Sequence, residues 1–83
     1  MHAGYLRVME HAIRKDLDSG HFSRGTFLGE RAAEIDPDAE QIQVALVRLY
    51  RLSGAHAAAA EQYEHYVRAL EELGVEALPL SEI

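Results

Sequence analysis

Histidine is the residue type in this chain best suited to bind a metal ion. The sequence contains five: His2, His11, His21, His56 and His65. A helical zinc site uses two histidines about one turn apart, usually supported by cysteine or carboxylate ligands. No two of these histidines are three or four residues apart, and the chain has no cysteine. His21 and His56 lie beside turn glycines and could meet at one end of the molecule, but a surface or capping role is the better interpretation. We expect no metal ion and no cofactor.

Two pairs of carboxylates could in principle perform acid–base chemistry. Glu71 and Glu72 lie near an expected helix end and fit solvated charge, whereas Asp36 and Asp38 fit complements to a helix dipole. The sequence also lacks a Ser–His–Asp spacing, a glycine-rich phosphate loop and a nucleotide-binding signature. We therefore predict that the chain is not an enzyme and has no catalytic residue.

Length and composition indicate one folded domain spanning residues 1–83, because 48% of the residues are hydrophobic. Fourteen acidic residues against eight basic ones give a net charge of −6, which argues against direct binding to a phosphate backbone. No apolar run approaches the roughly 20 residues needed to span a bilayer, and the N-terminus lacks a signal-peptide pattern. The absence of cysteine fits a reducing compartment. We expect a soluble, cytoplasmic protein without a membrane contact or a small-molecule substrate.

The elements that would position these side chains are helices. Apolar residues recur at three- and four-residue spacing along the chain, and no stretch alternates as a strand would. We expect four helices, over residues 2–17, 22–35, 37–52 and 55–73. The first should bury the stripe Leu6, Met9, Ile13 and Leu17, with Ala12 beside it. Short turns join the helices, which predicts an all-α fold of two antiparallel helical hairpins.

The second and third helices carry two unusual features. Gly25, Gly29 and Ala32 form a stripe of small residues in the second helix, where each glycine costs roughly 1 kcal/mol against alanine. Close approach of a neighbouring helix would compensate this cost, so we expect the stripe to be packed. Before the third helix, Asp36 is expected to act as a cap and Pro37 to occupy the first helical position. The third helix is apolar over much of its circumference, which predicts neighbours on two sides.

The fourth helix is a long amphipathic helix. Its apolar stripe comprises Ala59, Tyr63, Tyr66, Val67, Leu70 and Leu73. We interpret Tyr63 and Tyr66 as core tyrosines with hydroxyls at the rim rather than as ligand-stacking residues. Glu64 and Arg68 lie at the favourable i,i+4 spacing on the polar face. Gly74 should end the helix in a left-handed conformation, so that Val75 folds back towards Leu70.

The two hairpins repeat with a period of 34 residues. Ser19-Gly20 and Ser53-Gly54 lie 34 positions apart, and the same offset pairs Gly25 with Ala59 and Arg14 with Arg48. This is the length of a tetratricopeptide repeat, which predicts two hairpins stacked as a tetratricopeptide-like array. A four-helix bundle with a chance spacing is the alternative.

Several motifs together carry a family resemblance. They are Ala32-Ala33-Glu34-Ile35-Asp36-Pro37-Asp38-Ala39-Glu40, Ala45 to Tyr50, Ser53-Gly54, Ala57 to Ala60, Tyr63, Arg68, and Leu70-Glu71-Glu72-Leu73-Gly74-Val75-Glu76. Over Gly20 to Val75 the chain resembles the bacterial transcriptional activator domain, a tetratricopeptide-like domain found C-terminal to a winged-helix DNA-binding domain in antibiotic-regulatory activators. The chain departs from the family pattern where Ala77-Leu78 stands in place of a proline after Val-Glu, and where Ala55-His56 rather than arginine follows Gly54.

The resemblance implies a protein–protein interaction module of a bacterial transcriptional regulator. DNA would be bound only through a separate domain, and the chain would be a C-terminal part of a larger regulator. The contact would be to a second copy, to the DNA-binding domain or to the transcription machinery. Because about three repeats are usually needed for stability, we predict self-association through the open face of the first or last hairpin.

Two other classes of function compete with this interpretation. A stand-alone tetratricopeptide-like adaptor or oligomeric helical protein, unrelated to transcription, is the principal alternative. Its peptide groove would need converging Asn, Lys or Arg side chains, and the chain contains no asparagine and only one lysine, Lys15. A helical-bundle enzyme or metal binder is the third class, which the metal content of the purified protein would distinguish.

Overall fold

The computed structural model describes residues 2–37 and 39–83, without the side chains of residues 2, 3, 5 and 6. The described residues form four α-helices: α1 (His2–Ser19), α2 (Phe22–Ile35), α3 (Glu40–Leu52) and α4 (His56–Glu72). A single 3₁₀ turn, η1 (Leu80–Glu82), follows near the C-terminus. The predicted all-α fold is confirmed, whereas the predictions for the side chains of His2, Leu6 and Asp38 lie outside the described residues.

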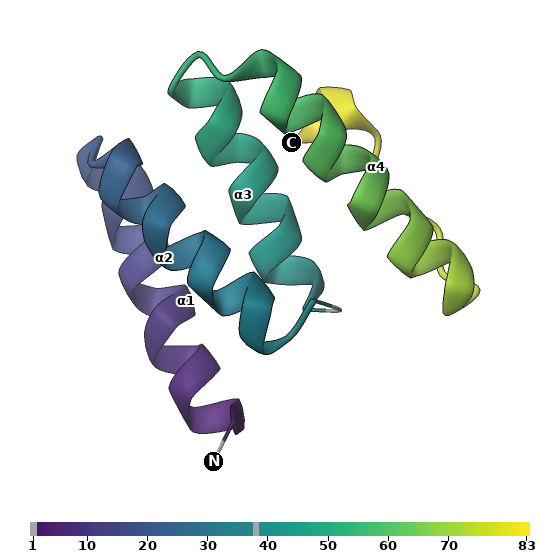
Figure 1. Cartoon of the computed structure of the whole chain (residues 1–83), viewed down its shortest axis with the longest axis horizontal. Helices are drawn as coiled ribbons and strands as arrows, with labels where there is room; N and C mark the ends of the chain where they lie inside the picture. Colours follow the sequence, from purple (N-terminus) through teal and green to yellow (C-terminus); the bar gives the residue numbers. More distant parts are fainter. Residues whose placement is uncertain (1, 38) are drawn as a thin grey trace.

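The helices form two hairpins packed side by side (Figure 1). α1 packs against α2 and α3 against α4, while α2 and α3 make the main contact between the hairpins. α1 and α4 therefore lie at opposite ends of the molecule, and α3 has helical neighbours on both sides (Figure 1). This arrangement fits a tetratricopeptide-like array and confirms that α3 is flanked on two sides.

Three helices end in the same glycine turn. Gly20, Gly54 and Gly74 all have positive φ, between 72° and 86°. In each turn, the N–H after the glycine donates to the carbonyl five residues back: His21 to Asp16, Ala55 to Tyr50, and Val75 to Leu70. These bonds satisfy carbonyls that the helix end would otherwise leave open. The helix end predicted at Gly74 is confirmed, and the turn glycines Gly20 and Gly54 end α1 and α3 in the same way.

The stripe of small residues on α2 lies directly under α3. Gly25 and Gly29 are buried, as is Ala32. A Cβ atom placed on Gly29 would lie 2.8 Å from the Leu46 side chain, and one on Gly25 would lie 2.9 Å from that of Leu49. Only residues without a side chain allow this approach, so the expectation that the stripe is packed is confirmed.

The start of α3 differs from the prediction. Asp36 ends α2 instead of capping α3, because its N–H still donates to the carbonyl of Ala32 at 3.0 Å. Pro37 lies in the connection, where its carbonyl accepts a hydrogen bond from the buried side-chain amide of Gln43. The cap is Ala39, whose carbonyl accepts the first bonds of the new helix. The predictions of Asp36 as cap and Pro37 as first helical residue were therefore wrong.

The core runs through all four helices. Its buried apolar members are Met9, Ile13, Ala32, Ile42, Leu46, Val47, Leu49, Ala59, Tyr66 and Leu70. Leu73 was predicted to belong to the buried apolar stripe of the fourth helix. It is 63% exposed, because it lies in the turn after α4 has ended. Two polar side chains, Asp16 and Gln43, are also buried in the core. None of the helices that the structure describes is long and apolar enough to cross a membrane.

Candidate interaction surface

The residues considered for metal or acid–base chemistry lie mostly on the exposed surface where their side chains are described. His11, His21, His56 and His65 are all exposed, as are Glu71 and Glu72. Among the side chains that the structure describes, no three from histidine or acidic residues gather in a group able to hold a metal ion. The candidate sites of this chain are therefore surfaces between helices.

An open groove of about 630 Å³ runs between α1 and α3. Ile13 is buried at its floor, and Leu17 and Val44 are half-buried there. Arg14 and Arg48 are exposed residues of its lining and occupy equivalent positions in the two 34-residue repeats. Carboxylates, among them that of Asp18, line the same groove. The groove thus combines an apolar floor with charges of both signs. Its lining does not favour a ligand of one particular charge.

The C-terminal segment, residues 75–83, is held against the second hairpin by two tyrosines. The hydroxyl of Tyr63 donates to the carbonyl of Leu78 at 2.8 Å, and the N–H of Leu78 donates to the hydroxyl of Tyr66 at 2.9 Å. The Tyr66 hydroxyl also donates to Glu40 at 3.1 Å. Burial, together with the Glu40 carboxylate, raises the pKa of Tyr66. Tyr66 is a core residue as predicted, but its fully buried hydroxyl is a structural hydrogen-bonding group rather than a rim group.

Arg51 holds the end of the same segment. Its guanidinium donates to the carbonyl of Leu80 at 3.0 Å and to that of Ile83 at 3.4 Å. The segment passes behind α4 and returns towards α3 (Figure 1), and Leu78 lines the α1–α3 groove. The chain itself therefore covers part of the second hairpin, whereas the outer side of the first hairpin carries no such segment among the described residues.

An ion pair between the exposed Arg24 and the buried Asp16 joins α1 to α2. Arg24 donates to one carboxylate oxygen of Asp16 at 2.7 and 2.9 Å, and this bond lowers the pKa of Asp16 against the opposing effect of burial. The other oxygen, Oδ2, is buried without a hydrogen-bond partner among the described residues. Sequence spacing did not predict this pair, because the two residues are eight positions apart across a turn. The signal that could have revealed it is an aspartate between Ile13 and Leu17, on the apolar stripe.

A hydrogen bond between side chains links the two hairpins at α2 and α3. The hydroxyl of Tyr50 donates to Glu30 at 2.6 Å. Burial, with the neighbouring Glu30 carboxylate, raises the pKa of Tyr50 to about 12. On α4, the predicted Glu64–Arg68 pair is confirmed, with a separation of 3.9 Å between exposed side chains. These contacts are structural and leave the surfaces of the molecule open to a partner.

Comparison with known proteins agrees with this architecture. A family model described as bacterial transcriptional activator domain matches residues 1–80. No curated protein and no solved structure matches the chain. The match includes α1, which lies before the span that carried the resemblance in the sequence.

Proposed function

Since the chain belongs to the bacterial transcriptional activator domain family, we propose that it is the protein–protein interaction and regulatory module of a bacterial transcriptional regulator. The match covers nearly the whole chain, so both hairpins contribute to this role. We propose further that the module does not itself bind DNA and is not an enzyme. Its net charge of −6 supports the first point, because a phosphate backbone repels an acidic surface.

The observation that carries this proposal is the combination of the family match with exposed apolar side chains on a small helical array. Val8 is 68% exposed and Phe27 is 59% exposed, both on the first hairpin. Repeat arrays bury a continuous core by stacking and leave apolar surface at an end without a neighbour. Such a surface supports contact with another protein, and we propose self-association through the open face of the first hairpin.

A reporter assay tests the proposed function. The chain is fused to an unrelated DNA-binding domain whose operator lies upstream of a reporter gene in a bacterial host. We expect transcription to change relative to the DNA-binding domain without the fusion, because the module would recruit or assemble a regulatory partner. An unchanged reporter at equal protein level would contradict the proposal. In parallel, the chain should not bind a labelled DNA duplex at physiological salt.

We propose that the chain acts in the cytoplasm as one domain of a larger regulator. The intact mass of the natural product tests this point against the 9.3 kDa of these 83 residues. A product several times heavier, with the additional mass before Met1, would agree. A product near 9.3 kDa would favour the alternative, a small tetratricopeptide-like adaptor unrelated to transcription, for which the α1–α3 groove is the candidate peptide site.

A further inference from the structure

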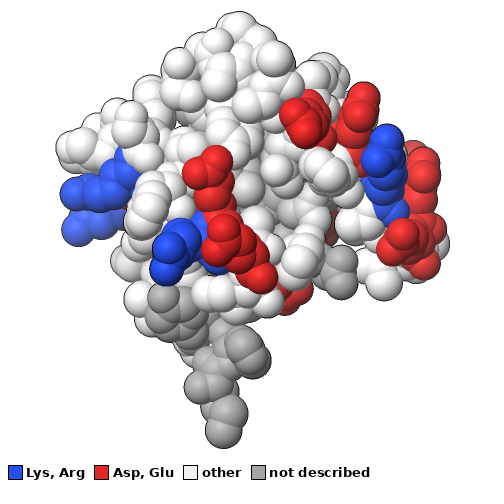
Figure 2. Space-filling view, viewed as in Figure 1, with Lys and Arg blue, Asp and Glu red and all other residues white. Residues whose placement is uncertain are grey.

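The net charge of the chain is confined to its second half. Residues 1–35 contain five basic and five acidic residues, whereas residues 36–83 contain three basic and nine acidic residues. The first hairpin is thus neutral overall, and the second carries the whole net charge of −6. Figure 2 shows basic side chains at the outer edge of α1 and α2, with acidic side chains beside them on α2, and mainly acidic side chains over α4.

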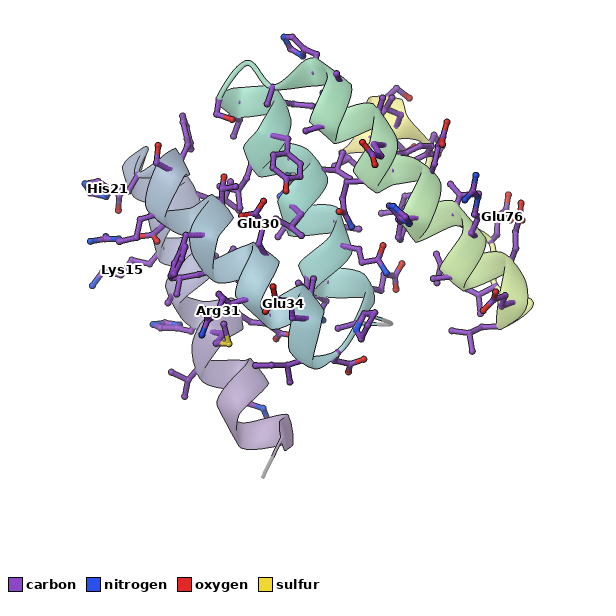
Figure 3. The ribbon with its side chains drawn as sticks, in the orientation of Figure 1. Lys15, His21, Glu30, Arg31, Glu34 and Glu76 are labelled. Atoms are coloured by element: carbon purple, nitrogen blue, oxygen red, sulfur yellow. The ribbon has the colours of Figure 1, made fainter. Side chains whose placement is uncertain are left out.

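The outer side of the first hairpin combines cations with exposed apolar side chains. We call it the basic face and define it by Val8, Lys15, Arg24, Phe27 and Arg31. Val8 and Lys15 are two turns apart on α1, and the Arg31 guanidinium lies 5.8 Å from the centre of the Phe27 ring on α2. Figure 3 shows Lys15 and Arg31 on the side of the molecule away from α3 and α4. Arg24 reaches from α2 to Asp16 on α1, which places its guanidinium over the boundary between these helices.

The C-terminal end of α4 has the opposite character. We call it the acidic end and define it by Glu71, Glu72, Leu73, Val75 and Glu76. The three glutamates are exposed, Leu73 is 63% exposed and Val75 is 50% exposed. These five residues are neighbours in the sequence on either side of the Gly74 turn. Each of the two surfaces therefore presents two exposed apolar side chains beside charges of one sign. On the basic face these charges are Lys15 and Arg31, since Arg24 is already paired with Asp16, and at the acidic end they are the three glutamates.

The two surfaces cannot meet within one molecule. The basic face lies on the side of α1 and α2, whereas Glu76 lies at the far side beyond α4 (Figure 3). Two basic faces would repel one another through Lys15 and Arg31 if they packed symmetrically. A nucleic acid fits the basic face poorly, because three cations release few counterions while the rest of the chain is strongly acidic.

We propose that the basic face of one molecule binds the acidic end of a second copy, in a head-to-tail contact. Val8 and Phe27 pack against Leu73 and Val75 of the other copy, while the surrounding cations face its glutamates. The inference rests on the proposed function and specifies its partner and surface. Because the contact joins two different surfaces, it is heterologous and builds a ring or an open chain of copies rather than a symmetric dimer.

Sedimentation velocity of the full chain, over micromolar to millimolar concentrations, tests this contact. We expect the average mass to rise with protein concentration. This assembly should weaken as salt is added, since salt screens exposed charges. The double variant Lys15→Glu/Arg31→Glu should weaken assembly by about tenfold or more, as like charges then face each other. The matched control Arg14→Glu/Arg48→Glu makes the same charge change in the α1–α3 groove. Its assembly should be only slightly weaker than that of the wild type.

A mixing experiment makes the assignment specific to the two surfaces. The variant Glu71→Lys/Glu76→Lys should also lose assembly when studied separately. An equimolar mixture of this variant with Lys15→Glu/Arg31→Glu should recover it, because opposite charges again meet. Circular dichroism checks that every variant remains helical.

Three results would overturn the head-to-tail contact: a wild-type chain that stays monomeric, a groove control as impaired as the basic-face variant, or a mixture that does not recover. A monomeric chain that still changes reporter transcription would reject this contact and the proposed self-association, and leave the proposed regulatory role intact. Assembly with the expected charge dependence, but without any reporter effect, would support the contact and contradict the proposed function.

Discussion

The hydroxyl of Tyr66 accepts a hydrogen bond from the backbone N–H of Leu78 at 2.9 Å, and in this way α4 holds the segment that follows it. Tyr63, one turn earlier on α4, donates to the carbonyl of the same residue. The rings of the two tyrosines lie 5.9 Å apart and are tilted by 53°. Both backbone groups of Leu78 are thereby satisfied by side chains, although Leu78 belongs to no helix or strand.

Removal of the Tyr66 hydroxyl should release this segment. In Tyr66→Phe the ring remains in the core, but the N–H of Leu78 loses its acceptor, which should lower the free energy of unfolding by about 1 to 2 kcal/mol. Amide exchange at Leu78 should accelerate more than exchange in the middle of α3. Tyr63→Phe is the matched control, because its hydroxyl bond is exposed and should cost less. Equal protection of Leu78 in the wild type and in Tyr66→Phe would contradict the assignment.

A methyl group at Gly29 should destabilise the fold although alanine favours helices. The new Cβ would lie 2.8 Å from the Cδ2 atom of Leu46, a residue that is 1% exposed and has little room to move. Overpacking of about 1 to 3 kcal/mol should exceed the roughly 1 kcal/mol gained in helix propensity. Gly4→Ala on α1 is the control, since its Cβ would meet no atom within 4 Å. Urea denaturation should give a lower midpoint for Gly29→Ala and no loss for Gly4→Ala.

The ion pair between Arg24 and the buried Asp16 should make stability depend on pH in the acid range. Arg24 lowers the pKa of Asp16 below its ordinary value of 3.8, so the unfolded chain binds a proton more readily than the native state. The stabilisation is therefore complete well above pH 3.8 and disappears as the pH falls through the native pKa. Asp16→Asn should be less stable at neutral pH and should lose less stability over this acid range. Asp18→Asn, an exposed neighbour on α1, should follow the wild-type profile in thermal melts.

The raised pKa of Tyr50 should depend on Glu30. Burial is the larger cause of the value of about 12, and the Glu30 carboxylate adds to it by accepting the hydroxyl bond. Glu30→Gln should lower the pKa of Tyr50 but leave it above the ordinary value of 10.0, because the burial remains. The ring carbon that bears the hydroxyl can be followed by NMR through an alkaline titration. A pKa unchanged in Glu30→Gln would show that the contact with Glu30 does not form in solution.

The sequence predicted the helices and the packed glycine stripe because both depend on local information. Apolar spacing identifies the face of each helix that is buried, and two glycines in one stripe indicate a close neighbour. The same reasoning missed the Asp16–Arg24 pair, since periodicity does not say which residue of another helix lies opposite. It also misplaced the start of α3, because Asp36-Pro37 is compatible with a cap and equally with the end of the preceding helix. The partner of Tyr66 lies 12 residues away in a segment without periodicity, where sequence spacing gives no guide.

The two tyrosines that hold Leu78 occupy positions where the first hairpin has small residues. At the 34-residue offset, Gly29 and Ala32 of α2 correspond to Tyr63 and Tyr66 of α4. On α2 the small residues admit the leucines of α3, whereas on α4 large rings fill the equivalent positions and hold the chain's own C-terminal segment. A third hairpin therefore could not pack on α4 in the way that α3 packs on α2. Extending this protein by concatenating further repeats would require small residues at positions 63 and 66, and designs that keep the tyrosines should terminate at two hairpins.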